Sequence, residues 1–282
     1  MYLLSDILYL IVYYVVRYRR GVTRANIDAC FPDMSQKECR KLERRYYRYM
    51  SDLLVEAVVG LYATPPFIKR HYRLTNRQVV DRYYEQGRTV ILLSAHYGNW
   101  EYMVASLGMQ LLHHGVGVGK PLDDKFMAKY ITRRRTRYGT QVVDQTDVRQ
   151  HVAFFDKHHV PCALMMLGDQ SPSNPHRSYW TTFLGRDTAF LYGAEHFARE
   201  YDYPVIYYTV HRVKRGYYEL TFEPLCEYPM QVPQYTIVEQ YARILERQIR
   251  QQPEYWLWSH RRWKLTREGR IQRDGTLRII PR

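Results

Sequence analysis

The alternation of short apolar runs with longer helical patterns is what most constrains the fold of this chain. Residues 88–94 read RTVILLS and residues 161–168 read PCALMMLG, and both runs end at small residues. An apolar run of this length is typical of a buried strand. Further strands are expected over 204–210 and 217–223, and helices over 101–112, 123–138, 148–156, 188–201 and 232–251. This order predicts an α/β fold with a mixed, mainly parallel central sheet flanked by helices, in which the late hairpin is antiparallel.

The chain starts with an apolar segment that basic residues follow at once. Residues 2–16 read YLLSDILYLIVYYVV, and Arg17, Arg19 and Arg20 come next. This segment is shorter than the roughly 20 residues that a spanning helix needs, and Asp6 would be costly in the hydrocarbon. Aromatic residues beside a basic cluster favour a helix that lies in the membrane interface. An ordinary buried first helix is the alternative.

The rest of the N-terminal region is basic and helical. Ser35 and Glu38 form a capping-box pattern at the start of a helix over 37–59, and Pro65-Pro66 ends the region. We therefore expect a helical, membrane-interface region over residues 1–65 and an α/β domain over residues 66–282.

The charge balance points to an anionic partner. Lys and Arg total 42 against 28 Asp and Glu, which gives a net charge of +14, and the chain has 28 Tyr. A hydrophobic content of 46% excludes a disordered chain. A basic, aromatic surface suits nucleic acid, a lipid headgroup layer or an acidic carrier protein, and composition does not choose among them.

Several familiar sites are absent from the sequence. There is no G-x-S-x-G nucleophile elbow and no H-E-x-x-H zinc motif. The stretch GVGVGK at 115–120 does not match the phosphate-binding loop, because Pro121 stands where a Ser or Thr would bind magnesium. The four cysteines are scattered and form no disulfide framework, and the two adjacent histidine pairs are unsuited to sharing a metal. We expect no metal site.

The most informative stretch is HYGNWE at residues 96–101. The strand over 88–94 ends there, Ala95 and Gly98 allow a sharp turn, and a helix begins near Glu101. In α/β folds, ligands bind at the carboxyl ends of strands. Across such a turn, the Glu101 carboxylate can accept a hydrogen bond from one imidazole nitrogen of His96, which keeps the other nitrogen as a base. Such a pair suits removal of a proton from an alcohol that attacks an acyl carbonyl. A structural role for the two residues is the alternative.

This stretch resembles the H-x4-E signature of the lipid A biosynthesis acyltransferases, the late or secondary acyltransferases within the lysophospholipid acyltransferase-like group. The resemblance extends over roughly residues 17–265, and its other blocks follow in the family's order. They are Asn26 to Pro32, Lys120 to Asp123 with the basic helix after it, Leu167 to Gln170, Phe183 to Gly185, and the closing WLWSHRRWK at 256–264.

The resemblance implies a glycerolipid acyltransferase-like fold and a reaction that moves a fatty acyl group from acyl carrier protein to a hydroxyl of a lipid A precursor or a related membrane glycolipid. His96 is then the general base and Glu101 its orienting partner. Arg135 is the best match to the family's essential Arg, with Arg137 as the near alternative. Asp169 matches the essential Asp, which would fix that Arg or a sugar hydroxyl. No cofactor is implied.

The resemblance also implies a place for the enzyme and its partners. It puts the protein on the cytoplasmic face of the inner membrane, peripheral or weakly anchored, where acyl carrier protein and an anionic membrane surface would both meet a basic face. Trp256 and Trp258 lie beside basic residues, which suits headgroup contact, and a core of tryptophans is the alternative.

Two alternatives stay open for the function. The residues Gln170, Ser171 and Pro172 depart from other branches of the family, so the acceptor could be another lipid, such as a lysophospholipid or an aminoacyl lipid. A nucleic-acid-binding protein would use the same basic and aromatic residues. No RNP-like motif is visible, and we expect no nucleic acid partner.

Overall fold

The computed structural model describes residues 1–119 and 125–281, with the side chains of residues 125–128 also undescribed. The expected block from Lys120 to Asp123 lies outside the described residues. The chain forms two compact units. The first contains Met1–Asp52, Gly168–Glu195 and Pro233–Arg282, and the second contains Leu53–Leu167 and His196–Val232. The separate division of the chain at residue 65 stays a prediction.

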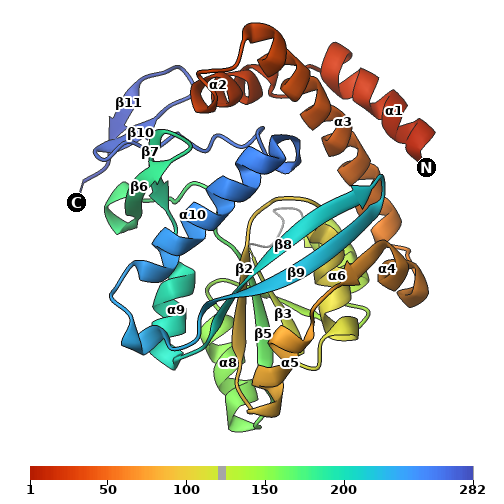
Figure 1. The fold of residues 1–282 in the computed structure, drawn as a ribbon, viewed down its shortest axis with the longest axis vertical. Coiled ribbons are helices and arrows are strands. Elements are labelled where there is room, and N and C mark those ends of the chain that lie inside the picture. The colour runs from red at the N-terminus through yellow and green to blue at the C-terminus, as the bar shows by residue number, and fades with distance from the viewer. Residues whose placement is uncertain (120–124, 282) are drawn as a thin grey trace. The chain divides into compact units, whose positions relative to one another are not determined.

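The second unit is built on a seven-stranded sheet (Figure 1). Between the described strands of this sheet, β8 and β9 form the one antiparallel pair, and the other neighbouring pairs are parallel. The mixed, mainly parallel sheet and the antiparallel late hairpin are therefore confirmed. In sheet order the strands are β1 (Tyr72–Leu74), β9 (Tyr217–Cys226), β8 (Val205–Lys214), β2 (Val90–Ser94), β5 (Cys162–Leu167), β3 (His114–Gly119) and β4 (Gln141–Asp144).

Helices cover this sheet and supply its core. They are α4 (Pro65–His71), α5 (Gln78–Glu85), α6 (Trp100–Gln110), α7 (Lys125–Arg135) and α8 (Val148–Lys157). Every residue of β2 is buried, as a central strand of a parallel sheet requires. Val90 and Leu92 of β2 belong to one apolar cluster with Tyr83 of α5 and Met103 of α6, so α5 and α6 pack on the same face of the sheet. The apolar runs in the sequence thus correspond to the strands at its centre.

The first unit opens with the helices α1 (Tyr2–Leu10) and α2 (Arg20–Cys30), which are joined by a π-helical turn (Ile11–Val15). Leu3 and Val15 keep 76% and 75% of their surface exposed, whereas Tyr9 and Tyr13 are buried. Among the described residues, none of the helices has both the length and the apolar character that crossing a membrane takes.

The next helix, α3 (Gln36–Gly60), has the predicted capping box. The Glu38 carboxylate accepts a hydrogen bond from the Ser35 amide at 2.8 Å, and the Ser35 hydroxyl accepts one from the Glu38 amide at 3.3 Å. Residues 53–60 of this helix belong to the second unit.

The hairpin of β6 (Tyr179–Phe183) and β7 (Arg186–Phe190) corrects one prediction. A helix was expected over 188–201, but the observed helix α9 spans only Gly193–Tyr201, because residues 188–190 pair with residues 179–181 in the hairpin. Leu184 and Gly185 make its two-residue turn, and both have positive φ angles, 52° and 77°.

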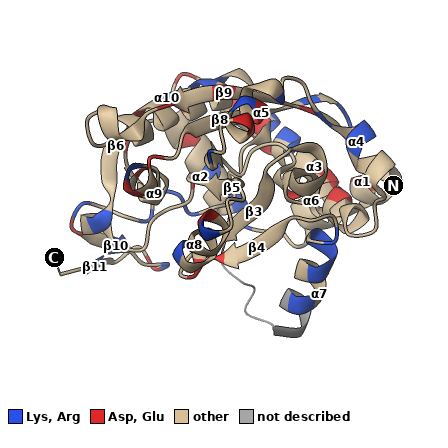
Figure 2. Cartoon of the chain, turned by 90° about the horizontal axis from the view of Figure 1, so that it is seen from below, with Lys and Arg blue, Asp and Glu red and all other residues tan. Residues whose placement is uncertain are grey.

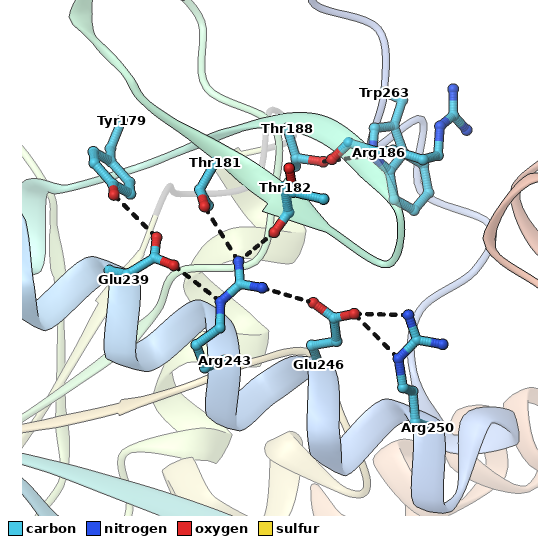
Figure 3. Close-up of polar contacts among 10 residues, drawn as sticks. All are labelled: Tyr179, Thr181, Thr182, Arg186, Thr188, Glu239, Arg243, Glu246, Arg250 and Trp263. Atoms are coloured by element: carbon cyan, nitrogen blue, oxygen red, sulfur yellow. Dashed lines mark hydrogen bonds and ion pairs between the residues drawn. The ribbon is translucent and has the colours of Figure 1, made fainter.

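A network of polar side chains ties this hairpin to α10 (Thr236–Gln251) (Figure 3). Arg243 donates to the Thr181 hydroxyl at 3.2 Å and to the Thr182 carbonyl. The same guanidinium pairs with Glu239 at 3.0 Å and with Glu246 at 3.2 Å. The remaining elements are the hairpin β10 (Gly269–Ile271) with β11 (Leu277–Ile279) and the 3-10 turns Pro175–Arg177, Pro229–Gln231 and Pro253–Tyr255.

None of the four cysteines forms a disulfide, and all four are buried. Burial raises the pKa of Cys30 and of Cys162 to about 12. These thiols therefore pack as small apolar groups.

Candidate functional site

The stretch HYGNWE forms the turn between β2 and α6. The Ser94 hydroxyl, at the end of β2, donates to the Tyr208 carbonyl of β8 at 2.8 Å. Gly98 has a φ of +60°, and a Cβ at this position would lie 2.6 Å from Cγ1 of Val210. The turn therefore needs glycine for its backbone conformation and for its close approach to β8. The sharp turn predicted at Gly98 is confirmed.

The start of α6 is fixed by Asn99, which is the N-cap residue. Its side-chain oxygen accepts a hydrogen bond from the Tyr102 amide at 3.0 Å. The His96 ring lies edge-on to the ring of Trp100, with centroids 5.2 Å apart. In the sequence, His96 thus precedes this cap and Glu101 follows it in the first turn of α6.

A buried carboxylate supports the same turn from α3. Glu56 is fully buried, and its Oε2 accepts hydrogen bonds from Asn99 Nδ2 at 2.8 Å and from the Tyr218 hydroxyl at 2.7 Å. Burial, together with the charge of Glu56, raises the pKa of Tyr102. Glu56 is a residue beside this turn that the sequence did not predict. Its one signal was an acidic residue inside the apolar run LLVEAVV, where a solvated charge is not expected.

Glu101 and Arg135 are joined by an ion pair. The Arg135 guanidinium, at the end of α7, lies 2.7 Å from Glu101 Oε2, and the two side chains are 31% and 23% exposed. Arg135 is the last of three arginines in the final turn of α7, a helix whose basic residues are blue in Figure 2. The structure therefore brings two predicted site residues together, although they are far apart in the sequence. The hydrogen bond expected between His96 and Glu101 stays a prediction.

Arg137 has different partners. Its guanidinium donates to the carbonyls of Leu61 and Ala63 and, at 3.3 Å, to the carbonyl of Gly60. These carbonyls lie at the end of α3 and just beyond it, where backbone carbonyls have no partner within the helix. The described contacts of Arg137 thus hold the end of α3, and Arg135 is the arginine that meets Glu101.

Asp169 belongs to the first unit, where it is almost fully buried. Its Oδ2 accepts a hydrogen bond from the Trp256 indole at 2.9 Å. Its negative charge also acts on the buried guanidinium of Arg262, which lies 4.6 Å from the centroid of the Phe190 ring. Burial lowers the pKa of Arg262 to about 10. The expected link between Asp169 and a catalytic arginine stays a prediction.

The closing block of the sequence packs inside the first unit. Trp256 and Trp258 are 2% and 0% exposed, so the expectation that they contact headgroups is wrong, and they form the core of tryptophans instead. Asn26, from the first family block, donates to the carbonyls of Trp258 and His260 at 2.8 Å and 2.9 Å. Two distant sequence blocks therefore share one structural role.

Two further features bear on what the site can hold. A hollow of about 770 Å³ lies among α7, β4 and α8, and its lining includes Thr136, Val142 and Phe154 but none of the predicted site residues. Within the described part of the chain, no group of three His, Cys, Asp or Glu side chains is arranged to hold a metal ion. The groups at the turn are those of acid–base chemistry: an imidazole, a carboxylate and a guanidinium.

The chain is similar in sequence to several known proteins. The chain is 23% identical over 254 residues to a lipid A biosynthesis lauroyltransferase of Escherichia coli (strain K12), which covers 89% of this chain and 81% of that protein. It is 24% identical over 249 residues to a lipid A biosynthesis palmitoleoyltransferase of the same organism, covering 87% of this chain and 79% of that protein. A lipid A biosynthesis acyltransferase of Haemophilus influenzae is 20% identical over 248 residues, covering 87% and 78%.

The profile of one family, described as bacterial lipid A biosynthesis acyltransferase, matches residues 4–265. This match covers nearly the whole chain and includes both of its compact units. The chain therefore belongs to the bacterial lipid A biosynthesis acyltransferase family.

Proposed function

We propose that the protein transfers a fatty acyl group from the thioester of acyl carrier protein to a hydroxyl of a lipid A precursor. His96 takes the proton of the acceptor hydroxyl while that oxygen attacks the thioester carbonyl. The C–S bond then breaks, and the thiolate of the carrier leaves and recovers the proton. Such a positioned base contributes about 10²- to 10⁴-fold to the rate.

The observation that carries this proposal is the pairing of Glu101 with Arg135 at the turn that carries His96. One carboxylate oxygen, Oε2, is engaged by Arg135 at 2.7 Å. The carboxylate can use its other oxygen to orient the imidazole. Arg135 also brings a permanent positive charge to the place where negative charge develops on the thioester oxygen. Its Nε is buried and has no hydrogen-bond partner among the described residues.

The decisive experiment is the substitution of His96 by Ala. The assay measures release of the carrier thiol from lauroyl-acyl carrier protein in the presence of a lipid A precursor. His96→Ala should lose at least about 100-fold in kcat. The control is His158→Ala, at an exposed histidine just after α8, which should keep the activity of the unsubstituted protein. If acyl transfer by His96→Ala is unchanged, the proposed mechanism is wrong.

The acceptor is tested in cells. The curated relatives are named for lipid A biosynthesis, which makes a lipid A precursor the first acceptor to examine. Mass spectrometry of membrane lipids with and without this protein should show a lipid A species that gains one acyl chain. A change confined to lysophospholipids or aminoacyl lipids would replace this acceptor with another.

We also propose that the first helices lie in the interface of the inner membrane, on its cytoplasmic face. Leu3, Leu4, Val15 and Val16 are each more than half exposed, which is unusual for a cluster of apolar side chains on a protein surface. The basic residues that follow suit anionic headgroups. High salt or alkaline carbonate should release part of the protein from membranes, whereas complete resistance to both would indicate a spanning segment.

A further inference from the structure

We propose that Glu56 is a positioning residue of the acyl-transfer site, because its buried carboxylate holds the turn between His96 and Glu101 through Asn99. The inference rests on the proposed roles of His96 and Glu101. It adds a residue that lies outside the H-x4-E signature, on a different helix.

The burial of Glu56 demands a reason. A carboxyl group without exposure loses its hydration, and proteins keep such a group only where hydrogen bonds replace the lost water. Two donors meet one of its oxygens, Asn99 Nδ2 at 2.8 Å and the Tyr218 hydroxyl at 2.7 Å. A Leu or Met at this position would leave both of these donors without this acceptor. The carboxylate is therefore explained by what it binds, and one of its two partners is part of the signature turn.

Asn99 has two separate tasks. Its Oδ1 caps α6 by accepting from the Tyr102 amide at 3.0 Å, while its Nδ2 donates to Glu56. The cap fixes the direction in which α6 leaves the turn, and the bond to Glu56 fixes where the turn lies. Asn99 stands three residues after His96 and two before Glu101, so a shift of its side chain would displace both. Misplacement of a reacting group by about 1 Å can cost about 100-fold in rate.

The helix that carries Glu56 is itself firmly held. Gly60 lies so close to α6 that a Cβ there would be 2.9 Å from the Tyr102 ring. The carbonyls that follow α3 accept hydrogen bonds from Arg137, two residues beyond Arg135. The end of α3 thus contacts both the helix that carries Glu101 and the segment that carries Arg135. This gives Glu56 a fixed base from which to position the turn.

The test exchanges the polarity of one hydrogen bond. Asn99→Asp retains the helix cap but places a second carboxyl group against Glu56, whereas Glu56→Gln removes the charge but keeps an amide oxygen that can still accept from Asn99. In the double variant, the amide of the new Gln can donate to the new Asp, so the bond returns with donor and acceptor reversed. We expect Asn99→Asp to lose about 10- to 100-fold in kcat with KM within about twofold, and Glu56→Gln to lose less, because its amide oxygen can still accept. The double variant should recover to within about fivefold of the unsubstituted protein.

Tyr218→Phe is the matched control, because it removes the other donor to Glu56 and leaves the turn bonded. It should keep kcat within about threefold, although it too removes a hydrogen bond from the same buried carboxylate. Thermal unfolding of each variant shows whether the protein assayed is folded. If the loss of Asn99→Asp persists in the double variant, or if folded Asn99→Asp keeps full kcat, the inference is overturned.

Failure of this inference is distinguishable from failure of the proposed function. If His96→Ala is inactive while the variants of Glu56 and Asn99 are all fully active, only the role of Glu56 is lost. If His96→Ala retains activity, the proposed site itself is wrong. In both cases the assay uses the full chain with lauroyl-acyl carrier protein as the donor.

Discussion

Substitution of Asp169 by Asn tests whether this family residue acts on the substrate or on the fold. Asn is nearly isosteric, and its side-chain oxygen can still accept the hydrogen bond from Trp256. What it removes is the negative charge beside Arg262, whose three guanidinium nitrogens have no hydrogen-bond partner among the described residues.

The magnitude follows from the burial of Arg262. Even with Asp169 nearby, its pKa falls from the usual 12.5 to about 10, which corresponds to about 3 kcal/mol against the charged form. Among the charges that act on Arg262, that of Asp169 has the largest effect, and removing one of two interacting buried charges costs about 3–5 kcal/mol. We expect Asp169→Asn to lower the free energy of unfolding by about that amount.

Urea unfolding followed by tryptophan fluorescence provides the assay, because Trp256 and Trp258 are buried in the same unit. The double variant Asp169→Asn with Arg262→Met removes both charges and should be more stable than Asp169→Asn alone. Asp274→Asn, in an exposed turn, is the control and should unfold like the unsubstituted protein. An unchanged midpoint for Asp169→Asn would refute the reasoning. A kinetic defect that persists in the stable double variant would instead assign Asp169 to the substrate.

Three more predictions concern the second unit. Burial lowers the pKa of His113 to about 4, and its Nε2 donates a hydrogen bond to a backbone carbonyl. As the pH falls below about 6.5, this side chain therefore takes up a proton in the unfolded state but stays neutral in the native state. Stability should therefore fall by about 3 kcal/mol between pH 6.5 and 4, and urea unfolding of His113→Phe should show a smaller dependence on pH. Gly98→Ala should lose at least about tenfold in kcat, whereas Gly87→Ala, with a φ of +68° but open space, should lose stability without losing kcat. Arg137→Lys should lower the free energy of unfolding by about 2 kcal/mol, measured by thermal unfolding, while the folded enzyme stays active. Arg135→Lys should instead lower kcat and leave the free energy of unfolding nearly unchanged. Equal losses of kcat in both variants would contradict this difference.

The central strands of the sheet could be predicted from the sequence, whereas the β6–β7 hairpin and the edge strands could not. The runs at 88–94 and 161–168 could be recognised as strands because a strand that is buried on both faces has an unbroken run of apolar residues. The β6–β7 hairpin left no comparable signal. Its turn has Leu184 in a left-handed conformation that is usually occupied by Asn or Gly, so the turn pattern of a hairpin is missing. The short edge strands β1 and β4 have too few residues to show any period.

In the candidate site, too, the local features could be predicted from the sequence and the contacts between distant residues could not. The turn at Gly98 could be predicted because all of its residues are consecutive in the sequence. The contact of Glu101 with Arg135 joins different helices, and no spacing rule relates them. Glu56 was missed because a single acid in an apolar helix has no pattern of its own, and its purpose is visible only beside Asn99.

The buried cysteines can be used to measure local unfolding of the protein. Cys30 and Cys39 belong to the first unit, and Cys162 and Cys226 to the second. A buried thiol reacts with a maleimide only after the structure around it opens. Peptide mapping of alkylated protein would therefore time the opening of each unit separately, without any engineered label.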